Sequence, residues 1–267
     1  MREPRLGDSK GKNKAFTSKV PDVEQASLKQ VVETLWRGRA FRHITLAFCL
    51  SVFFGAGMAM WIPAFFMRTH GMGAGELGTW LGLSWGIGGL CSTFLGGFLA
   101  TRYAPDKESL QMKGVAAVVV LCSVFHGLCF LSSNQTMALI YIALVVGWLI
   151  PLLMAPVYSS IQSLVEVRMR AVAVAFISLL SNLIGMGFGP IVVGLLSDML
   201  EPIVGQESLR YALLLLIPVY LWCAWHCWKA ADTIEEDIRL IEKKSASVEG
   251  DNDALEGHAS YQPAMGK

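Results

Sequence analysis

Few residues in this sequence could perform covalent chemistry, and one serine stands in a known catalytic pattern. Residues 82–86 read G-L-S-W-G, which matches the G-x-S-x-G pattern of serine hydrolases. In esterases that pattern requires a turn between a strand and a helix, which an apolar helix does not provide. An intramembrane serine protease pairing Ser84 with His226 is the enzyme alternative that stays open. The favoured prediction is that the chain is not an enzyme and has no catalytic residues.

Residues for metal, redox or proton chemistry are also sparse. All six cysteines lie in apolar segments and form no C-x-x-C pair, which is typical of small packing residues. His126 is the only histidine well inside an apolar segment, and Glu76, Glu166 and Asp198 stand at segment ends. Proton relays in membranes usually need internal carboxylates or histidines. We therefore predict no metal site and no cofactor, and we expect any coupling acid to lie elsewhere.

Aromatic and weakly polar side chains recur at helical spacing in three apolar segments and suggest a binding cavity. Aromatic walls with a few polar anchors are typical of a site for an apolar or amphiphilic molecule. For each aromatic residue taken singly, packing against lipid is the competing interpretation. The predicted substrate-cavity residues are Trp61, Phe65, Arg68, Trp148, Tyr158, Gln162, Ser178 and Asn182.

The composition indicates which elements must position these side chains. The 267 residues are 54% hydrophobic and 16% charged, whereas a soluble domain is about 45–50% apolar and about 25% charged. This excludes a disordered chain and a small disulfide-stapled domain, and a net charge of +1 argues against a nucleic-acid partner. Six segments lack Asp, Glu, Lys and Arg, and each is long enough to cross a bilayer: residues 44–67, 77–100, 114–132, 137–164, 171–197 and 211–228. We predict an all-α polytopic membrane protein with a six-helix domain over residues 43–230.

Polar regions flank the six segments. Residues 1–42 are predicted to form a cytoplasmic linker with an amphipathic helix, whose apolar face includes Leu28, Val31, Val32, Leu35 and Trp36. Residues 231–267 are predicted to form a cytoplasmic tail, helix-like over 232–244 and disordered beyond. With a cytoplasmic N-terminus, 20 of the 22 Lys and Arg lie on one side, so the positive-inside rule places both termini in the cytoplasm.

Small residues mark two of the predicted helices. Glycines recur about every four residues over 78–97, and a second stripe contains Ser181, Gly185 and Gly189, followed by Pro190. Such stripes let helix backbones approach closely in lipid. Whether they serve only packing or also allow the helices to rock is left open by the sequence.

The second stripe belongs to a longer motif that resembles a known family. Residues 185–198 read G-x-G-x-G-P-x-x-x-G-x-x-S-D, similar to the eleventh helix of the spinster-like branch of the major facilitator superfamily. Residues 61–71 and 75–78 resemble the end of its seventh helix and the start of its eighth. Residues 96–102 resemble its loop signature, although Thr101 replaces the usual Asp; Glu166 likewise stands where a Pro is common. Residues 2–5 (R-E-P-R) resemble the motif after the sixth helix.

The resemblance implies the C-terminal six-helix half of a transporter in the bacterial inner membrane. Spinster-like proteins are associated with lysolipid and sphingoid amphiphiles, which implies an amphiphilic substrate moved by alternating access. A separate N-terminal half or a second copy would complete the cavity, and a truncated, non-transporting fragment is the alternative. The residues that the motifs assign to gating and packing are Gly97, Arg102, Arg170, Gly185, Gly189, Pro190 and Asp198.

Overall fold

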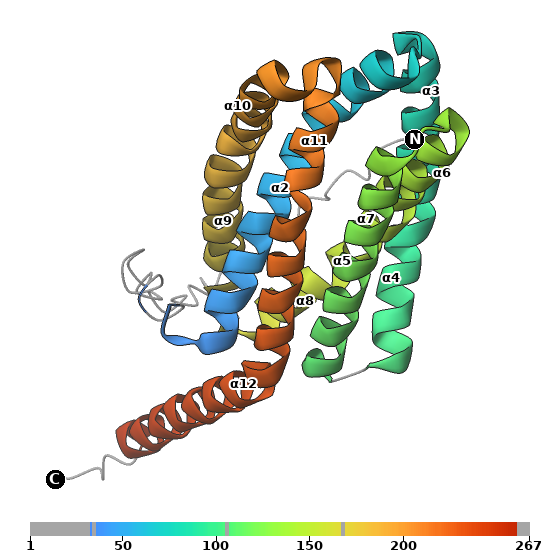
Figure 1. The fold of residues 1–267 in the computed structure, drawn as a ribbon. Coiled ribbons are helices and arrows are strands. Elements are labelled where there is room, and N and C mark those ends of the chain that lie inside the picture. The colour runs from blue at the N-terminus through green and yellow to red at the C-terminus, as the bar shows by residue number, and fades with distance from the viewer. Residues whose placement is uncertain (1–32, 34–35, 105–106, 167–168, 261–267) are drawn as a thin grey trace, which may run out of the picture.

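The computed structural model is a bundle of long helices (Figure 1) and describes residue 33 and residues 36–104, 107–166 and 169–260. Every regular element among these residues is helical. The elements of the first half are α2 (Arg39–His70), α3 (Ala74–Leu83), the π-helical turn η1 (Ser84–Gly88), α4 (Gly89–Tyr103) and α5 (Glu108–Leu131). The later elements are α6 (Gln135–Leu144), the π-helical turn η2 (Val145–Leu149), α7 (Ile150–Leu152), α8 (Met154–Ser163), α9 (Arg170–Ser181), the π-helical turn η4 (Asn182–Met186), α10 (Gly187–Val204), the 3₁₀ turn η5 (Gly205–Glu207), α11 (Ser208–Leu215) and α12 (Ile217–Ser260).

Five helical stretches in the described part of the chain are long and apolar enough to cross a membrane: Arg39–His70, Ala74–Tyr103, Glu108–Leu131, Gln135–Ser163 and Arg170–Lys243. The last has 74 residues and reverses direction at η5, where Gly205 adopts a positive φ of 59° (Figure 1). It therefore supplies both the fifth and the sixth expected spans. The predicted all-α, polytopic membrane fold is confirmed, and the count of six holds when this folded stretch is counted twice.

Helix ends are fixed by local residues and, in one case, by a distant one. Gly71 ends α2 in the left-handed conformation, with φ of 65°, which glycine adopts without steric cost. Asn134 caps α6, since its side chain accepts a hydrogen bond from the Met137 amide at 3.1 Å. At the start of α2, Gly38 has no side chain to do this. The Asp237 carboxylate of α12 takes that role and accepts from the Ala40 amide at 2.7 Å.

Aromatic side chains from α2, α5 and α12 form the most buried part of the bundle. Phe54 stacks on Tyr220 with ring centroids 4.1 Å apart, and His126 meets both rings edge-on. Further along α2, the Phe65 ring meets Phe130 of α5 at 5.2 Å. These contacts hold the first, third and sixth spans together and leave the other spans to form the remaining side of the bundle.

Glycines bring the other spans into backbone contact. A Cβ atom at Gly96 of α4 would collide with the carbonyl oxygen of Leu152 in α7. A Cβ atom at Gly189 of α10 would likewise collide with the carbonyl oxygen of Phe53 in α2. The second span thus crosses the fourth, and the fifth crosses the first, at distances that only glycine permits.

The flanks differ in how much of them the structure describes. The amphipathic helix expected over residues 28–36 lies mostly outside the described residues. At the other end, the structure differs from the expected disorder beyond residue 244, because α12 continues to Ser260 and leaves the bundle (Figure 1). The physical reason is that extending an existing helix needs no new nucleation, so moderate helix formers suffice.

Candidate functional site

A largely apolar depression of about 530 Å³ lies where the first, second, fourth and fifth spans meet. Its lining comes chiefly from α2, with α3, η1, η2, α7, η4 and α5 completing it. The lining residues are Val52, Phe54, Gly55, Ala56, Met58, Ala59, Ile62, Leu81, Gly82, Trp85, His126, Val146, Ile150 and Met186. The volume falls in the range of small-molecule sites, so we take the depression as the candidate functional site.

Only two of the lining side chains carry nitrogen. Trp85 is 63% exposed and carries an indole N–H donor. His126 is buried, and its Nδ1 lies 2.9 Å from the carbonyl oxygen of Cys122 on the same helix. The arrangement can bind a hydrocarbon body by burial and orient it through one or two hydrogen bonds, and it offers no carboxylate to hold a cation.

Three π-helical turns position part of the lining. Trp85 belongs to η1, Val146 to η2 and Met186 to η4. A π turn bonds residue i to i+5 rather than i+4, and such turns occur frequently at functional sites. Close packing holds two of them together, since a Cβ atom at Gly88 of η1 would lie 2.9 Å from the carbonyl oxygen of Gly147 in η2.

None of the eight predicted cavity residues, all of which are described, lines this depression. In the first span, Phe65 is fully buried in the aromatic core, and Arg68 is exposed near the end of α2. Trp61 is half-buried, and its Nε1 donates a hydrogen bond to the carbonyl oxygen of Pro190 at 2.9 Å. It thus connects α2 to α10, and it also packs against Gly194.

The predicted cavity residues of the fourth and fifth spans are dispersed. Trp148 is 44% exposed and lines a separate pocket beside Glu76. Tyr158 meets the Phe48 ring edge-on at 5.9 Å, and Gln162 is exposed. In the fifth span, the exposed Asn182 side chain donates to the carbonyl oxygen of Ser178 at 2.7 Å, so these two residues do lie together. Contact of any of them with a substrate stays a prediction.

The predicted gate and packing residues fall into two groups. Gly185 and Gly189 are buried against α2, and Pro190 is partly buried and receives the Trp61 hydrogen bond. The others lie at helix ends or on open faces. Gly97 is partly buried near Ala155, while Arg102, Arg170 and Asp198 are exposed.

The serine and histidine of the protease alternative have different neighbours. Ser84 starts η1, where its carbonyl oxygen lies against Gly147. His226 lies on α12, with its Nδ1 2.8 Å from the Nδ1 of His43 on α2. The structure therefore pairs His226 with another histidine.

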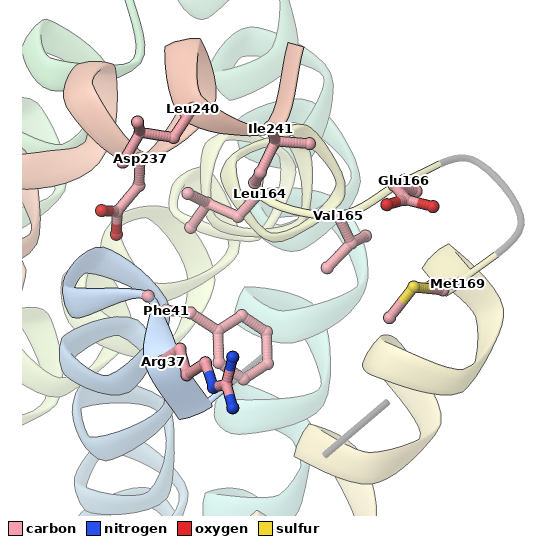
Figure 2. A pocket seen from close by; sticks show the side chains of 10 residues that line it. Arg37, Phe41, Leu164, Val165, Glu166, Met169, Asp237, Leu240 and Ile241 are labelled. Carbon is pink, nitrogen blue, oxygen red and sulfur yellow. The ribbon is translucent and has the colours of Figure 1, made fainter. Parts of the chain in front are cut away.

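A second pocket, of about 370 Å³, lies at the end of the bundle where α2 begins (Figure 2). Phe41, Leu164 and Leu240 contribute apolar walls, and Arg37 and Asp237 contribute charges. Figure 2 shows the Asp237 carboxylate directed toward the first turn of α2, consistent with its bond to the Ala40 amide. This pocket lies where α12 meets the first turn of α2 and the segment that follows α8.

Replacing Asp237 with alanine is expected to lower the free energy of unfolding by about 0.5–2 kcal/mol, because α2 loses its capping carboxylate. Thermal unfolding in detergent measures the loss, and hydrogen exchange should show faster opening of the first turn of α2. Glu236→Ala, at the exposed neighbouring position, is the matched control. Equal stability of the two variants would show that the cap contributes nothing.

Comparison with known proteins gives the family. Residues 2–190 match the model of the Major Facilitator Superfamily. The chain belongs to the major facilitator superfamily. A curated member from Mycolicibacterium smegmatis, described as an MFS-type efflux pump, is 32% identical over 187 residues, covering 69% of this chain and 43% of that protein.

Solved structures show the same superfamily fold. A bacterial homologue of the human lysosomal transporter Spinster, inward-facing and unoccupied, matches with a TM-score of 0.69 and 22% identity over 89% of this chain and 55% of that one. Its occupied form matches with a TM-score of 0.64 and 20% identity, over 75% and 50%. The chain thus spans about half the length of the superfamily relatives that it matches, and the predicted resemblance to a spinster-like facilitator fold is confirmed.

Proposed function

We propose that this multi-pass membrane protein is the C-terminal six-helix half of a spinster-like transporter. It would move an amphiphilic or lipid-like solute by alternating access in the bacterial inner membrane, with both termini in the cytoplasm. The observation that carries the proposal is the apolar depression on four spans, with Trp85 as its exposed polar group. Such a surface suits a molecule with a long hydrocarbon part.

A partner half is part of the proposal. The second span has only 17% of its most apolar window buried, against 44% in α5. Leu90 and Phe94 on α4 are 76% and 79% exposed, and Leu183 of η4 is 66% exposed. We infer that an N-terminal six-helix half, or a second copy of this chain, covers these faces and completes the cavity wall.

Uptake of a fluorescent lysophosphatidylcholine into proteoliposomes tests the proposal. If the partner is an N-terminal half, the chain alone is expected to give no saturable uptake, because half of the cavity wall is missing. Co-reconstitution with the N-terminal half of the M. smegmatis relative is expected to restore it. Oxidative crosslinking through Cys91, which is exposed on α4, would identify a second copy as the partner instead. Saturable uptake by the chain alone, in vesicles that hold one copy each, would overturn the partner requirement.

A further inference from the structure

Three cations stand at one boundary of the apolar region, on three helices that pack together. Arg42 on α2, Lys113 on α5 and Lys229 on α12 each lie within two residues of an uncharged apolar segment. α12 packs against both α2 and α5. Arg42 precedes His43, whose ring contacts His226, and Lys229 follows His226 by three residues on α12. The three positive charges therefore gather at one corner of the bundle.

Three tryptophans occupy the same corner. Trp222, Trp225 and Trp228 follow one another at intervals of three residues on α12 and are 55%, 49% and 51% exposed. The Lys113 Nζ lies 5.8 Å from the centre of the Trp228 ring, a cation–π distance. At a rise of about 1.5 Å per residue, Trp225 lies only roughly 6 Å inward from Lys229, and tryptophans are enriched at the interface between lipid headgroups and water.

A histidine pair fixes the middle of this surface. His43 and His226 approach through their Nδ1 atoms at 2.8 Å and join α2 to α12. Both rings meet the Trp225 ring edge-on, with centroids 5.9 and 4.8 Å away. The Cys223 thiol adds a second link, donating to the Ala47 carbonyl oxygen at 3.2 Å. The Trp225 ring is thus held by its neighbours while about half of it stays open.

From this juxtaposition we propose a binding site for the headgroup of an anionic phospholipid at the α2–α5–α12 corner. The negatively charged phosphate of the lipid would lie among Arg42, Lys113 and Lys229. Its glycerol region and upper acyl chains would lie against the tryptophans. One acidic neighbour opposes this: Asp232 pairs with Lys229 at 3.8 Å. Both side chains of that pair are more than 40% exposed, so the pair is weak and a lipid phosphate can share the lysine.

A phospholipid fits this corner better than a protein segment does. The cations lie at the edge of the membrane core rather than beyond it, and the aromatic side chains point outward from α12. Basic pockets between membrane helices recognise anionic headgroups. The site requires only that the chain spans a bilayer, so it does not depend on the proposed transport.

Fluorescence quenching by brominated lipids tests the site in the full chain. The contribution of the three tryptophans is the difference between the unchanged protein and a Trp222→Phe/Trp225→Phe/Trp228→Phe variant, both reconstituted in vesicles. At equal mole fraction and low salt, dibrominated phosphatidylglycerol is expected to bind there about three- to tenfold more strongly than dibrominated phosphatidylcholine. Equal quenching by the two lipids in this difference signal would overturn the proposal.

Removing charge gives the decisive comparison. Arg42→Gln/Lys229→Gln is expected to bring the preference close to one, whereas Arg239→Gln, further along α12 and exposed, should leave it unchanged. Circular dichroism and gel filtration check that each variant folds. If the double variant does not fold, a salt titration of the unchanged protein decides. Raising salt from about 0.05 to about 0.5 M should abolish the preference if it is electrostatic, and a preference that survives would overturn the site.

Discussion

Gly96→Ala is expected to lower the free energy of unfolding by about 1–3 kcal/mol, the usual cost of overpacking. The new methyl group would meet the Leu152 carbonyl oxygen. Because that atom belongs to the backbone, no side-chain movement relieves the clash, and α4 must separate from α7. The separation would also expose the Ser92 hydroxyl, which donates to the Gly147 carbonyl oxygen of the same crossing at 3.1 Å.

The adjacent glycine supplies the control for this experiment. A Cβ atom at Gly97 would have its nearest neighbour, the Ala155 Cβ, at 3.8 Å, an ordinary contact. Gly97→Ala should therefore be neutral or slightly stabilising, by up to about 1 kcal/mol, since alanine is the better helix former. The midpoints of thermal unfolding in detergent compare the two variants. If both destabilise equally, helix contact at Gly96 is not the cause.

The second large effect is expected at the candidate site itself. Gly82→Trp places an indole at a position that lines the depression, where a Cβ atom would have no neighbour within 4 Å. The protein should fold, but the added ring would fill space needed by a hydrocarbon chain. Binding of fluorescent lysophosphatidylcholine should weaken by roughly tenfold or more, equivalent to ~1.4 kcal/mol.

A second glycine of α3 provides the control. It distinguishes filling of the depression from a general effect of adding a tryptophan to this helix. Gly78 also has open space at its Cβ position but does not line the depression. Gly78→Trp is therefore expected to bind the amphiphile normally, and fluorescence anisotropy in detergent measures both variants. Normal binding by Gly82→Trp would mean that the amphiphile binds elsewhere.

The membrane spans could be predicted because the evidence for a span is the summed apolar character of many residues. Each apolar segment sums about twenty residues, so errors at single positions cancel. The ends were less predictable: α5 begins at Glu108, whereas its uncharged segment begins at residue 114. The first turn of α5 is charged and lies before the apolar segment. A search for uncharged segments therefore does not include it.

The inward-facing side of each helix was harder to predict, because it depends on the angle of each residue about the helix axis. Trp148 and Tyr158 share a face at a constant spacing of about 3.6 residues per turn. In the structure, η2 inserts a π turn over Val145–Leu149 and the helix is interrupted at Leu153 between α7 and α8. Each irregularity rotates the later part of the helix, so positions counted across it no longer share a face.

Trp85 illustrates a residue that sequence reasoning overlooked although a signal was present. It lies between Gly82 and Gly86, and 63% of it is exposed. The G-x-S-x-G pattern drew attention to Ser84, the neighbouring residue. Similarly, Asp237 looked like one of several acidic residues in a polar stretch, because nothing local indicates that its partner is the Ala40 amide.

That partnership has a consequence for the order of events during synthesis. Asp237, whose carboxylate caps α2, stands 197 residues after Ala40, whose amide donates the hydrogen bond. At about 5–20 residues per second, the first helix waits about 10–40 seconds after its own synthesis before Asp237 exists. Asp237 can therefore cap α2 only after α12 has been synthesised and has packed against the start of the bundle.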